Sequence, residues 1–472
     1  MKQLKYYFIF LLLLIGLTTV SAQEKALSKK QLALPLLKIS ANNRYFESAD
    51  GKPFFWLGDT GWLLFIKLNR QEVIQYLDNR KQKGYNVIQV MVLHDVKKVV
   101  NRYGDSALKN LDAAHPKTTP GTNFSNNTEY DFWDHVDFVI NEALKRGIYM
   151  ALVPVWGSNV KDGLVNESSA KAFAGFLAKR YRNQSNIIWL NGGDILGDTK
   201  TQVWESIGTT LRKEDPNHLI TFHPRGRSSS SQWFHNAAWL DFNMFQSGHK
   251  DYAQDTVEPR MGEDNWKFMQ KDYQLKPTKP SMDGEPSYEN IPHGLHDTLG
   301  PKWHAADVRR YGYWNVFAGG AGFTYGSNAV MQFHSAAGSG DYGTHQNWKD
   351  AINDTGAGQM QWIKKLILSM PYFERVPDQS LIASDQGEKY QHLLATRGKK
   401  FAFIYTYTGR TMNIQMGKIA GTKLTASWFD PRNGNYTTIG VFENKGTHVF
   451  NPPGEEKEGN DWILVLKSAP TK

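Results

Sequence analysis

The sequence predicts a (β/α)8 barrel followed by a small antiparallel β-sandwich, and two observations lead to this prediction. Strand-like apolar runs alternate with amphipathic helical stretches from about residue 54 to 368, an alternation typical of α/β folds with parallel strands. Beyond Met370-Pro371, apolar residues recur at every second position, which indicates short antiparallel strands separated by turns. We therefore expect the barrel within residues 23–372 and the β-sandwich within residues 373–472.

Eight strands are expected in the first part, each followed by a helical stretch. They are predicted at residues 54–57, 87–93, 149–155, 187–190, 219–222, 241–246, 280–283 and 322–325. A hairpin over residues 37–46 is expected before them, and the last helix is expected at about residues 358–368. A doubly wound open sheet is the alternative, but no glycine-rich phosphate turn follows the first strand.

The N-terminus has the pattern of a secretory signal peptide. Lys2 and Lys5 precede an apolar run, and Val20-Ser21-Ala22 is a small-residue cleavage site. The apolar run is short for a membrane span. We expect removal of residues 1–22, export to the periplasm or the extracellular space, and no membrane contact after cleavage.

Composition narrows the classes of function. The chain has no cysteine, which removes disulfides, thiol catalysis and cysteine metal sites. The formal net charge is +9, but Lys and Arg are scattered along the chain, which argues against a nucleic-acid partner. Aromatic residues make up 13% of the chain, and aromatic faces suit the apolar C–H faces of sugars. We expect a monomer with a polysaccharide or oligosaccharide substrate.

Polar and aromatic residues stand just beyond the predicted strands. In a barrel, the loops after the strands build the active site, so these residues are candidate sugar contacts. They are Asp59, Trp62, His94, Asp95, Trp156, Asn191, His223, Arg225, Gln246, His249, Tyr288 and Tyr325, together with His334 in the loop after the eighth strand. That loop is expected either to form a wall of the site or to be a surface excursion.

Two carboxylates follow the fourth and the seventh strand. Asp194 ends the stretch Asn186–Asp194, and Glu285 follows Ser281-Met-Asp-Gly. Because these strands lie across the barrel mouth from each other, the two acids suit glycosidic bond cleavage, with one acting as acid and the other as nucleophile or base. We expect Asp194 to be partly protonated near neutral pH and Glu285 to be ionised.

Several motifs carry a family resemblance. They are Phe55–Trp62, Val87–His94, Asn186–Asp194, Phe245–His249 and Asp283–Pro286. Together they resemble the apiosidase-like glycoside hydrolases, glycoside hydrolase family 140, over about residues 35 to 370. The resemblance implies cleavage of apiose, a branched furanose, from side chains of the plant cell-wall pectin rhamnogalacturonan II. It also implies that Asp194 is the acid/base and Glu285 the nucleophile.

Other interpretations stay open at this point. Many barrel glycosidases carry Asn-Glu at the end of the fourth strand, where this chain has Gly193-Asp194, so the retaining or inverting outcome is open. The rival functions are an arabinofuranosidase, an endo-β-glycanase, and a non-catalytic polysaccharide-binding protein. No metal or cofactor is expected, because the sequence has no zinc helix motif and no phosphate loop.

The sequence pattern predicts five short strands in the C-terminal part. They are predicted at residues 393–396, 400–407, 424–429, 436–441 and 462–466. The segment resembles a domain named for collagen binding, but we expect it to pack on the barrel and stabilise it.

Overall fold

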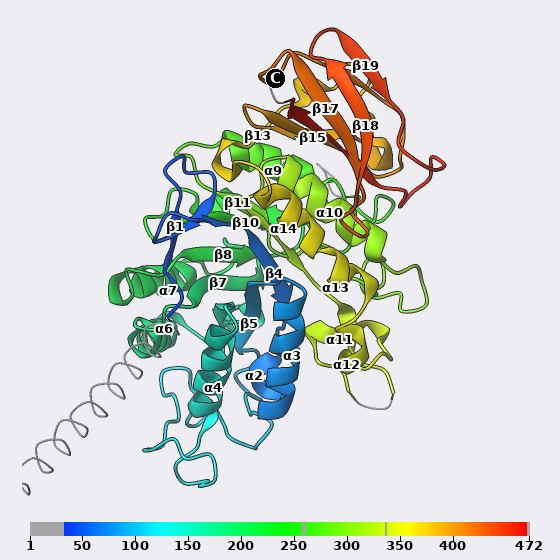
Figure 1. The fold of residues 1–472 in the computed structure, drawn as a ribbon. Helices are drawn as coiled ribbons and strands as arrows, with labels where there is room; N and C mark the ends of the chain where they lie inside the picture. The colour runs from blue at the N-terminus through cyan, green and yellow to red at the C-terminus, as the bar shows by residue number, and fades with distance from the viewer. Residues whose placement is uncertain (1–32, 257–260, 336–337, 470–472) are drawn as a thin grey trace, which may run out of the picture.

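The computed structural model describes residues 33–256, 261–335 and 338–469. The expected signal peptide and its cleavage site lie outside the described residues. Figure 1 shows a helix-covered sheet in blue to yellow, with the C-terminal strands in orange and red packed at one end. Within the described ranges, no helix is long and apolar enough to cross a membrane.

The central sheet has eight parallel strands in the order β8-β7-β6-β5-β4-β12-β11-β10, and the two-residue β9 (Ser228–Ser229) joins β10 antiparallel. The parallel strands are β4 (Trp56–Thr60), β5 (Val87–Leu93), β6 (Tyr149–Val155), β7 (Ile187–Ile195), β8 (Ile220–Pro224), β10 (Asn243–Gln246), β11 (Ser281–Asp283) and β12 (Gly322–Tyr325). The backbone N–H of Asp241 donates to the carbonyl of Ile220 at 2.9 Å, which brings β10 beside β8. The sheet therefore closes as the predicted barrel rather than staying an open doubly wound sheet.

Helices cover the outside of this sheet. The longer ones are α3 (Arg70–Gln82), α4 (Phe132–Lys145), α6 (Glu167–Tyr181), α7 (Thr201–Glu214), α9 (Asn265–Gln274), α10 (Ala305–Phe317) and α14 (Gln361–Leu368). The shorter ones are α2 (Leu64–Lys67), α5 (Gly157–Lys161), α8 (Ser231–Phe234), α11 (Asn328–Met331), α12 (Trp348–Ala351) and α13 (Thr355–Gln359). Capping explains where several begin: Asp131 accepts from the backbone N–H groups of Trp133 and Asp134 at the start of α4.

The first strand differs from its prediction. Apolar residues end at Leu57, but backbone pairing continues, with Gly58 opposite Val87 of β5 and Asp59 opposite Tyr325 of β12. β4 therefore starts two residues later and ends three residues later than expected. The reason is that neighbouring strands, and not side-chain hydrophobicity, determine where a central strand ends.

A small antiparallel sheet covers one end of the barrel. It consists of β1 (Leu37–Ile39), β2 (Phe46–Ser48) and β3 (Pro53–Phe54), which confirms the predicted N-terminal hairpin. The ring of Phe46 packs against Phe242 and Trp56 at centroid distances of 4.9 and 6.2 Å. Because both partners lie at the N-terminal ends of barrel strands, this sheet closes the N-terminal end of the barrel. The C-terminal ends of the strands lie at the opposite end.

The C-terminal part is an antiparallel β structure. A six-stranded sheet contains β13 (Val376–Pro377), β14 (Leu394–Arg397), β15 (Phe401–Thr406), β20 (Trp462–Ser468), β17 (Lys423–Phe429) and β18 (Tyr436–Glu443). A second sheet pairs β16 (Met412–Gln415) with β19 (Thr447–Phe450). Between the barrel and this domain, α10 lies beside β14 and β15, and its Tyr313 stacks on Tyr405 at 5.0 Å. The two parts therefore share a packed interface, as the sequence predicted.

Candidate active site

The end of β7 turns Asp194 into the barrel mouth. Gly192 and Gly193 have φ values of +89° and +115°, which glycine adopts without strain. A Cβ atom at Gly192 would lie 2.6 Å from the carbonyl of His223, and one at Gly193 would lie 2.6 Å from the ring of Trp156. Asp194 itself has φ +47°, an uncommon conformation for a residue with a side chain. The two glycines are therefore needed for the turn that presents Asp194.

The end of β11 holds Glu285 rigidly. A Cβ atom on Gly284 would lie 2.4 Å from the sulfur of Met244, so the glycine allows this buried side chain to pack closely against the strand end. The carbonyl of Gly284 accepts from the side chain of Gln89 at 2.8 Å. The backbone N–H of Glu285 donates to Asp283, which is fully buried, at 3.3 Å. Glu285 therefore follows directly after a short strand whose backbone is held by contacts on both sides.

Two histidines contact the Glu285 carboxylate. His223 Nε2 lies 3.1 Å from Oε2, and His249 Nε2 lies 3.3 Å from Oε1. The backbone N–H of Asp194 donates to His223 Nδ1 at 3.4 Å. Since Nδ1 accepts this bond, the ring proton that faces Glu285 is on Nε2.

The surroundings separate the pKa values of the two acids. Burial by itself would raise the pKa of Glu285, but the contacts with His223 and His249 outweigh it and lower the pKa to about 2. Burial and the charge of Glu285 raise the pKa of Asp194 to about 6, although its side chain keeps access to solvent through the cavity. Both directions agree with the expectation from the sequence. Glu285 is therefore ionised over a pH range in which Asp194 carries a proton.

Both acids line one cavity of about 180 Å³ with an aromatic wall. Trp62 packs against Trp156 at 5.4 Å and edge-on against His223 at 5.3 Å. Trp62 Nε1 also donates to the hydroxyl of Tyr288 at 2.9 Å. Flat rings beside carboxylates suit a sugar, whose C–H face is apolar and whose hydroxyls need polar partners.

The loop after β12 supplies a wall that the sequence left undecided. Met331, Gln332, Asp341 and Tyr342 line the cavity. The side chain of Gln332 bridges the loop, donating to the carbonyl of Asp341 and accepting from its N–H at 3.0 and 2.8 Å. Burial, and then the charges of Glu285 and Asp194, raise the pKa of Tyr342, so its phenol stays protonated near both acids.

The structure brings part of the predicted set together. Six of the predicted sugar contacts line the cavity with the two acids, and they are Trp62, His94, Trp156, Gln246, His249 and Tyr288. His223 lies against Glu285. Besides the loop after β12, sequence reasoning missed Leu63, Met91, Ile291 and Leu295. These are apolar residues that any core position would also explain.

Two predicted contacts lie on the outer face of the barrel and need correction. Asp59 is fully buried, 2.6 Å from Arg80 Nε and 2.5 Å from the hydroxyl of Tyr76. Tyr325 donates to Glu289 at 2.5 Å. Since Asp59 and Tyr325 are direct partners in the sheet, their side chains share a face, and that face packs against helices.

Four further candidates also lie elsewhere. Asn191 is buried and donates to the carbonyl of Trp204 in α7 at 2.7 Å. Asp95 accepts from the N–H of Lys97 in a turn, and His334 lines a different cavity. Arg225 does not line the cavity. Its positive charge partly offsets the effects that raise the pKa of Asp194.

Within residues 33–256, 261–335 and 338–469, no group of three or more His, Asp or Glu residues could hold a metal ion.

Comparison with known proteins gives two family matches. Residues 40–374 match the family described as "Apiosidase-like, catalytic domain". Residues 376–467 match the family described as "Putative collagen-binding domain of a collagenase". No curated protein sequence matches the chain.

Solved structures resemble most of the chain. One described as "Glycoside hydrolase" is 46% identical, with a TM-score of 0.87 over 93% of this chain and 98% of that one. A glycoside hydrolase family 5 structure from Bacteroides vulgatus is 44% identical, with a TM-score of 0.86 over 92% of this chain and 93% of that one. With its barrel and paired acids, this chain is a TIM-barrel glycoside hydrolase. More narrowly, the first family match spans most of the chain, and the protein belongs to the apiosidase-like family.

Proposed function

We propose that this enzyme releases apiose from side chains of rhamnogalacturonan II, with Asp194 as general acid/base and Glu285 as nucleophile. The observation that carries the proposal is the pair of acids with separated pKa values in one small, aromatic-walled cavity. Membership in the apiosidase-like family supports the choice of sugar. The expected signal peptide supports export of the enzyme.

The size of the cavity supports a small terminal sugar. Its volume is about 180 Å³, below the range of about 300–1,000 Å³ typical of pockets for drug-sized ligands. A single furanose ring is a better match to this space than several sugar units of a polysaccharide backbone. This favours an apiosidase over an endo-β-glycanase, while an arabinofuranosidase would need a pocket of similar size.

We infer a retaining mechanism, in which Glu285 attacks the anomeric carbon. The pKa of Glu285 is lowered to about 2, so its carboxylate is ionised and available as the nucleophile at the working pH. Asp194 protonates the leaving oxygen, and a covalent glycosyl-enzyme forms on Glu285. Asp194 then takes a proton from the water that hydrolyses this intermediate.

Substrate and stereochemistry can be tested together. The wild-type enzyme is incubated with a panel of aryl apiosides, aryl arabinofuranosides and pectic oligosaccharides, and NMR records the anomer that forms first. Apiose release with retained configuration is expected. Preference for arabinofuranosides would replace the proposed sugar, and an inverted first product would remove the nucleophile role of Glu285.

Separate substitutions test the two roles. Glu285→Gln should abolish turnover of every substrate while sugar binding remains. Asp194→Asn should lose activity on natural oligosaccharides but keep part of it on an aryl apioside, whose leaving group needs little protonation. Full activity in either variant would contradict the assignment and favour a non-catalytic role for that acid.

A further inference from the structure

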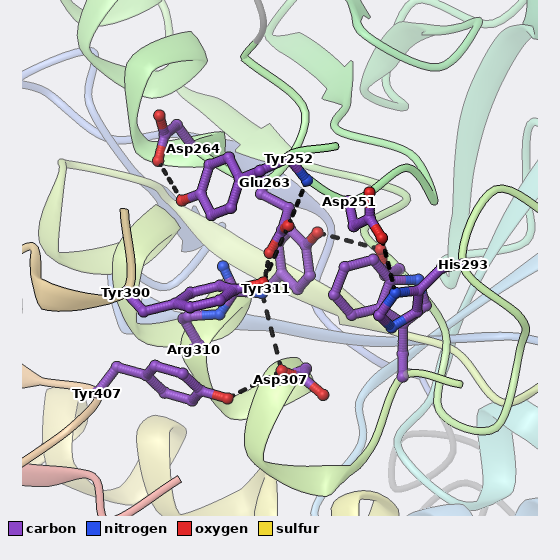
Figure 2. Close-up of polar contacts among 12 residues, drawn as sticks. Asp251, Tyr252, Glu263, Asp264, His293, Asp307, Arg310, Tyr311, Tyr390 and Tyr407 are labelled. Atoms are coloured by element: carbon purple, nitrogen blue, oxygen red, sulfur yellow. Dashed lines mark hydrogen bonds and ion pairs between the residues drawn. The ribbon is translucent and has the colours of Figure 1, made fainter. Parts of the chain in front are cut away.

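A buried arginine side chain lies where the C-terminal domain meets the barrel. Arg310 of α10 is fully buried, and its Nη2 lies 2.7 Å from Glu263 Oε2 (Figure 2). The ring centres of Tyr390 and Tyr407, both from the C-terminal domain, lie 4.8 and 5.2 Å from the guanidinium carbon of Arg310. The ion pair lies within the barrel, and the C-terminal domain supplies two of the aromatic rings around its cation.

Glu263 connects this junction to the chain that follows β10. Its Oε1 accepts from the backbone N–H of Tyr252 at 2.7 Å and from the hydroxyl of Tyr390 at 3.1 Å. The rings of Tyr252 and Tyr390 also pack edge to face at 5.2 Å. A residue of the C-terminal domain thus shares one carboxylate oxygen with the backbone of a barrel loop.

Tyr252 is only three residues from His249, which contacts Glu285. On the other side, the carbonyl of His249 accepts from the N–H of Gly294 at 2.7 Å and from Trp303 Nε1 at 3.2 Å. These bonds fix the position of His249, while the Glu263 contact fixes the chain just beyond it. The backbone around His249 is therefore held on both sides.

Two further contacts join the two sides near this loop: Lys389 Nζ lies 5.4 Å from the centre of the Tyr252 ring, and His392 stacks on Trp266 at 4.1 Å. A cavity of about 570 Å³ lies between the two sides, lined by Tyr252, Asp255, Trp266 and Lys267 on the barrel side and by residues 386–389 and His392 on the other.

We propose that Tyr390 positions His249 against Glu285 through Glu263 and Tyr252, so that the C-terminal domain completes the active site. The catalytic part of this inference rests on the role proposed for Glu285. Tyr390 is a positioning residue, because it lies in the other domain and is not part of the wall of the cavity that holds the two acids.

The test compares Tyr390→Phe with Tyr407→Phe in the full-length protein. Tyr390→Phe removes only the hydroxyl that donates to Glu263 and keeps the ring. Tyr407→Phe removes a hydroxyl that donates to Asp307 at 2.9 Å at the same junction, with no bond to the loop. It is therefore a matched control for loss of one interdomain hydrogen bond.

Tyr390→Phe should lower kcat about tenfold with little change in KM, because small misplacements of catalytic groups are costly. The acidic limb of its pH profile should move to higher pH, since a looser His249 stabilises the Glu285 carboxylate less. Tyr407→Phe should show neither effect. Equal kinetics and pH profiles in the two variants would overturn the proposal, because both would then report stability alone.

A substrate-independent measurement separates this inference from the proposed function. Hydrogen–deuterium exchange of the peptide covering residues 247–256 should increase in Tyr390→Phe and stay at the wild-type level in Tyr407→Phe. If the wild-type enzyme does not cleave apiosides, the proposed substrate fails, and the kinetic comparison uses whichever glycoside it does cleave. Unchanged exchange in Tyr390→Phe, or increased exchange with unchanged kcat, would overturn the positioning role.

Discussion

His223 contacts both Glu285 and the backbone of Asp194, the two acids of the proposed mechanism. Its Nε2 lies 3.1 Å from Glu285 Oε2, and its Nδ1 accepts from the backbone N–H of Asp194 at 3.4 Å. One buried ring therefore connects the end of β7 with the end of β11. Because each nitrogen has a different partner, the ring is held in one orientation and one tautomer.

Replacement of His223 should weaken the ionised form of Glu285. A histidine close to a buried carboxylate favours its ionised form, so His223→Ala should lower kcat/KM roughly tenfold and raise the pKa of Glu285. Steady-state kinetics across the acidic pH range measures both effects. His223→Gln, which can still offer an N–H group, should recover part of the loss. Wild-type kinetics in His223→Ala would show that His249 alone suffices.

The pH dependence should follow the two acids. In the proposed mechanism, activity needs ionised Glu285, whose pKa is lowered to about 2, and protonated Asp194, whose pKa is raised to about 6. We expect kcat/KM to fall as the pH rises through about 6, because Asp194 then loses its proton. Asp194→Asn, assayed on an aryl apioside, should lack this alkaline limb. An unchanged limb in that variant would assign it to another group.

Asp59 should contribute to stability rather than to catalysis. Asp59→Asn leaves Arg80 buried without its ion-pair partner, and breaking a buried pair costs about 3–5 kcal/mol. Chemical denaturation should show this loss of stability. At denaturant concentrations below the unfolding transition, kcat per folded molecule should equal that of the wild type. Asp78→Asn is the control, because Asp78 is half exposed and such pairs are worth about 0–1 kcal/mol. A stable but inactive Asp59→Asn would restore a role in the active site.

The domain interface contains a second buried ion pair with a clear prediction. Asp461 binds Arg309 of α10 in a bidentate manner at 2.7 and 2.8 Å, and both side chains are buried. Asp461→Ala should lower the free energy of unfolding by about 3–5 kcal/mol. Glu443→Ala, which breaks the exposed pair with Lys423, should cost about 0–1 kcal/mol. Equal effects in the two variants would mean that the interface does not stabilise the protein.

Gly193 should be intolerant of any side chain. Its φ of +115° and the ring of Trp156, 2.6 Å from a built Cβ atom, both oppose alanine. Gly193→Ala should cost about 1–3 kcal/mol of stability through backbone strain and should lower kcat, because Asp194 is the next residue. Gly163→Ala is a control with positive φ and open space around it. Equal losses of kcat in both variants would contradict the local explanation.

Much of the fold was predictable because parallel barrel strands are continuous apolar runs. β5, β6 and β12 have the predicted bounds, since turn residues or polar residues flank each run. β16 and β19 were not predicted. Each is four residues long. β16 has alternating apolar residues at Met412 and Ile414, but two such residues do not distinguish a strand from a loop, and β19 is largely exposed.

The candidate site was predictable only as a set of strand ends. From the sequence alone, four residues were equally good candidates for the site, because each lies near the end of a predicted strand. They are Asn191, Asp194, Asp59 and Trp62. The structure separates them, since side chains along a strand alternate between the two faces. Asp194 escapes this alternation because Gly192 and Gly193 let the backbone turn.

The sequence by itself determined the alternating strand and helix order and the pair of carboxylates after strands four and seven. Only the tertiary structure decided which neighbours those carboxylates have. His223 and Glu285 are 62 positions apart in the chain, and their contact exists because the barrel closes and brings β8 beside β10. The separated pKa values follow from that closure, since burial and hydrogen bonding depend on distances in space and not on distance along the chain.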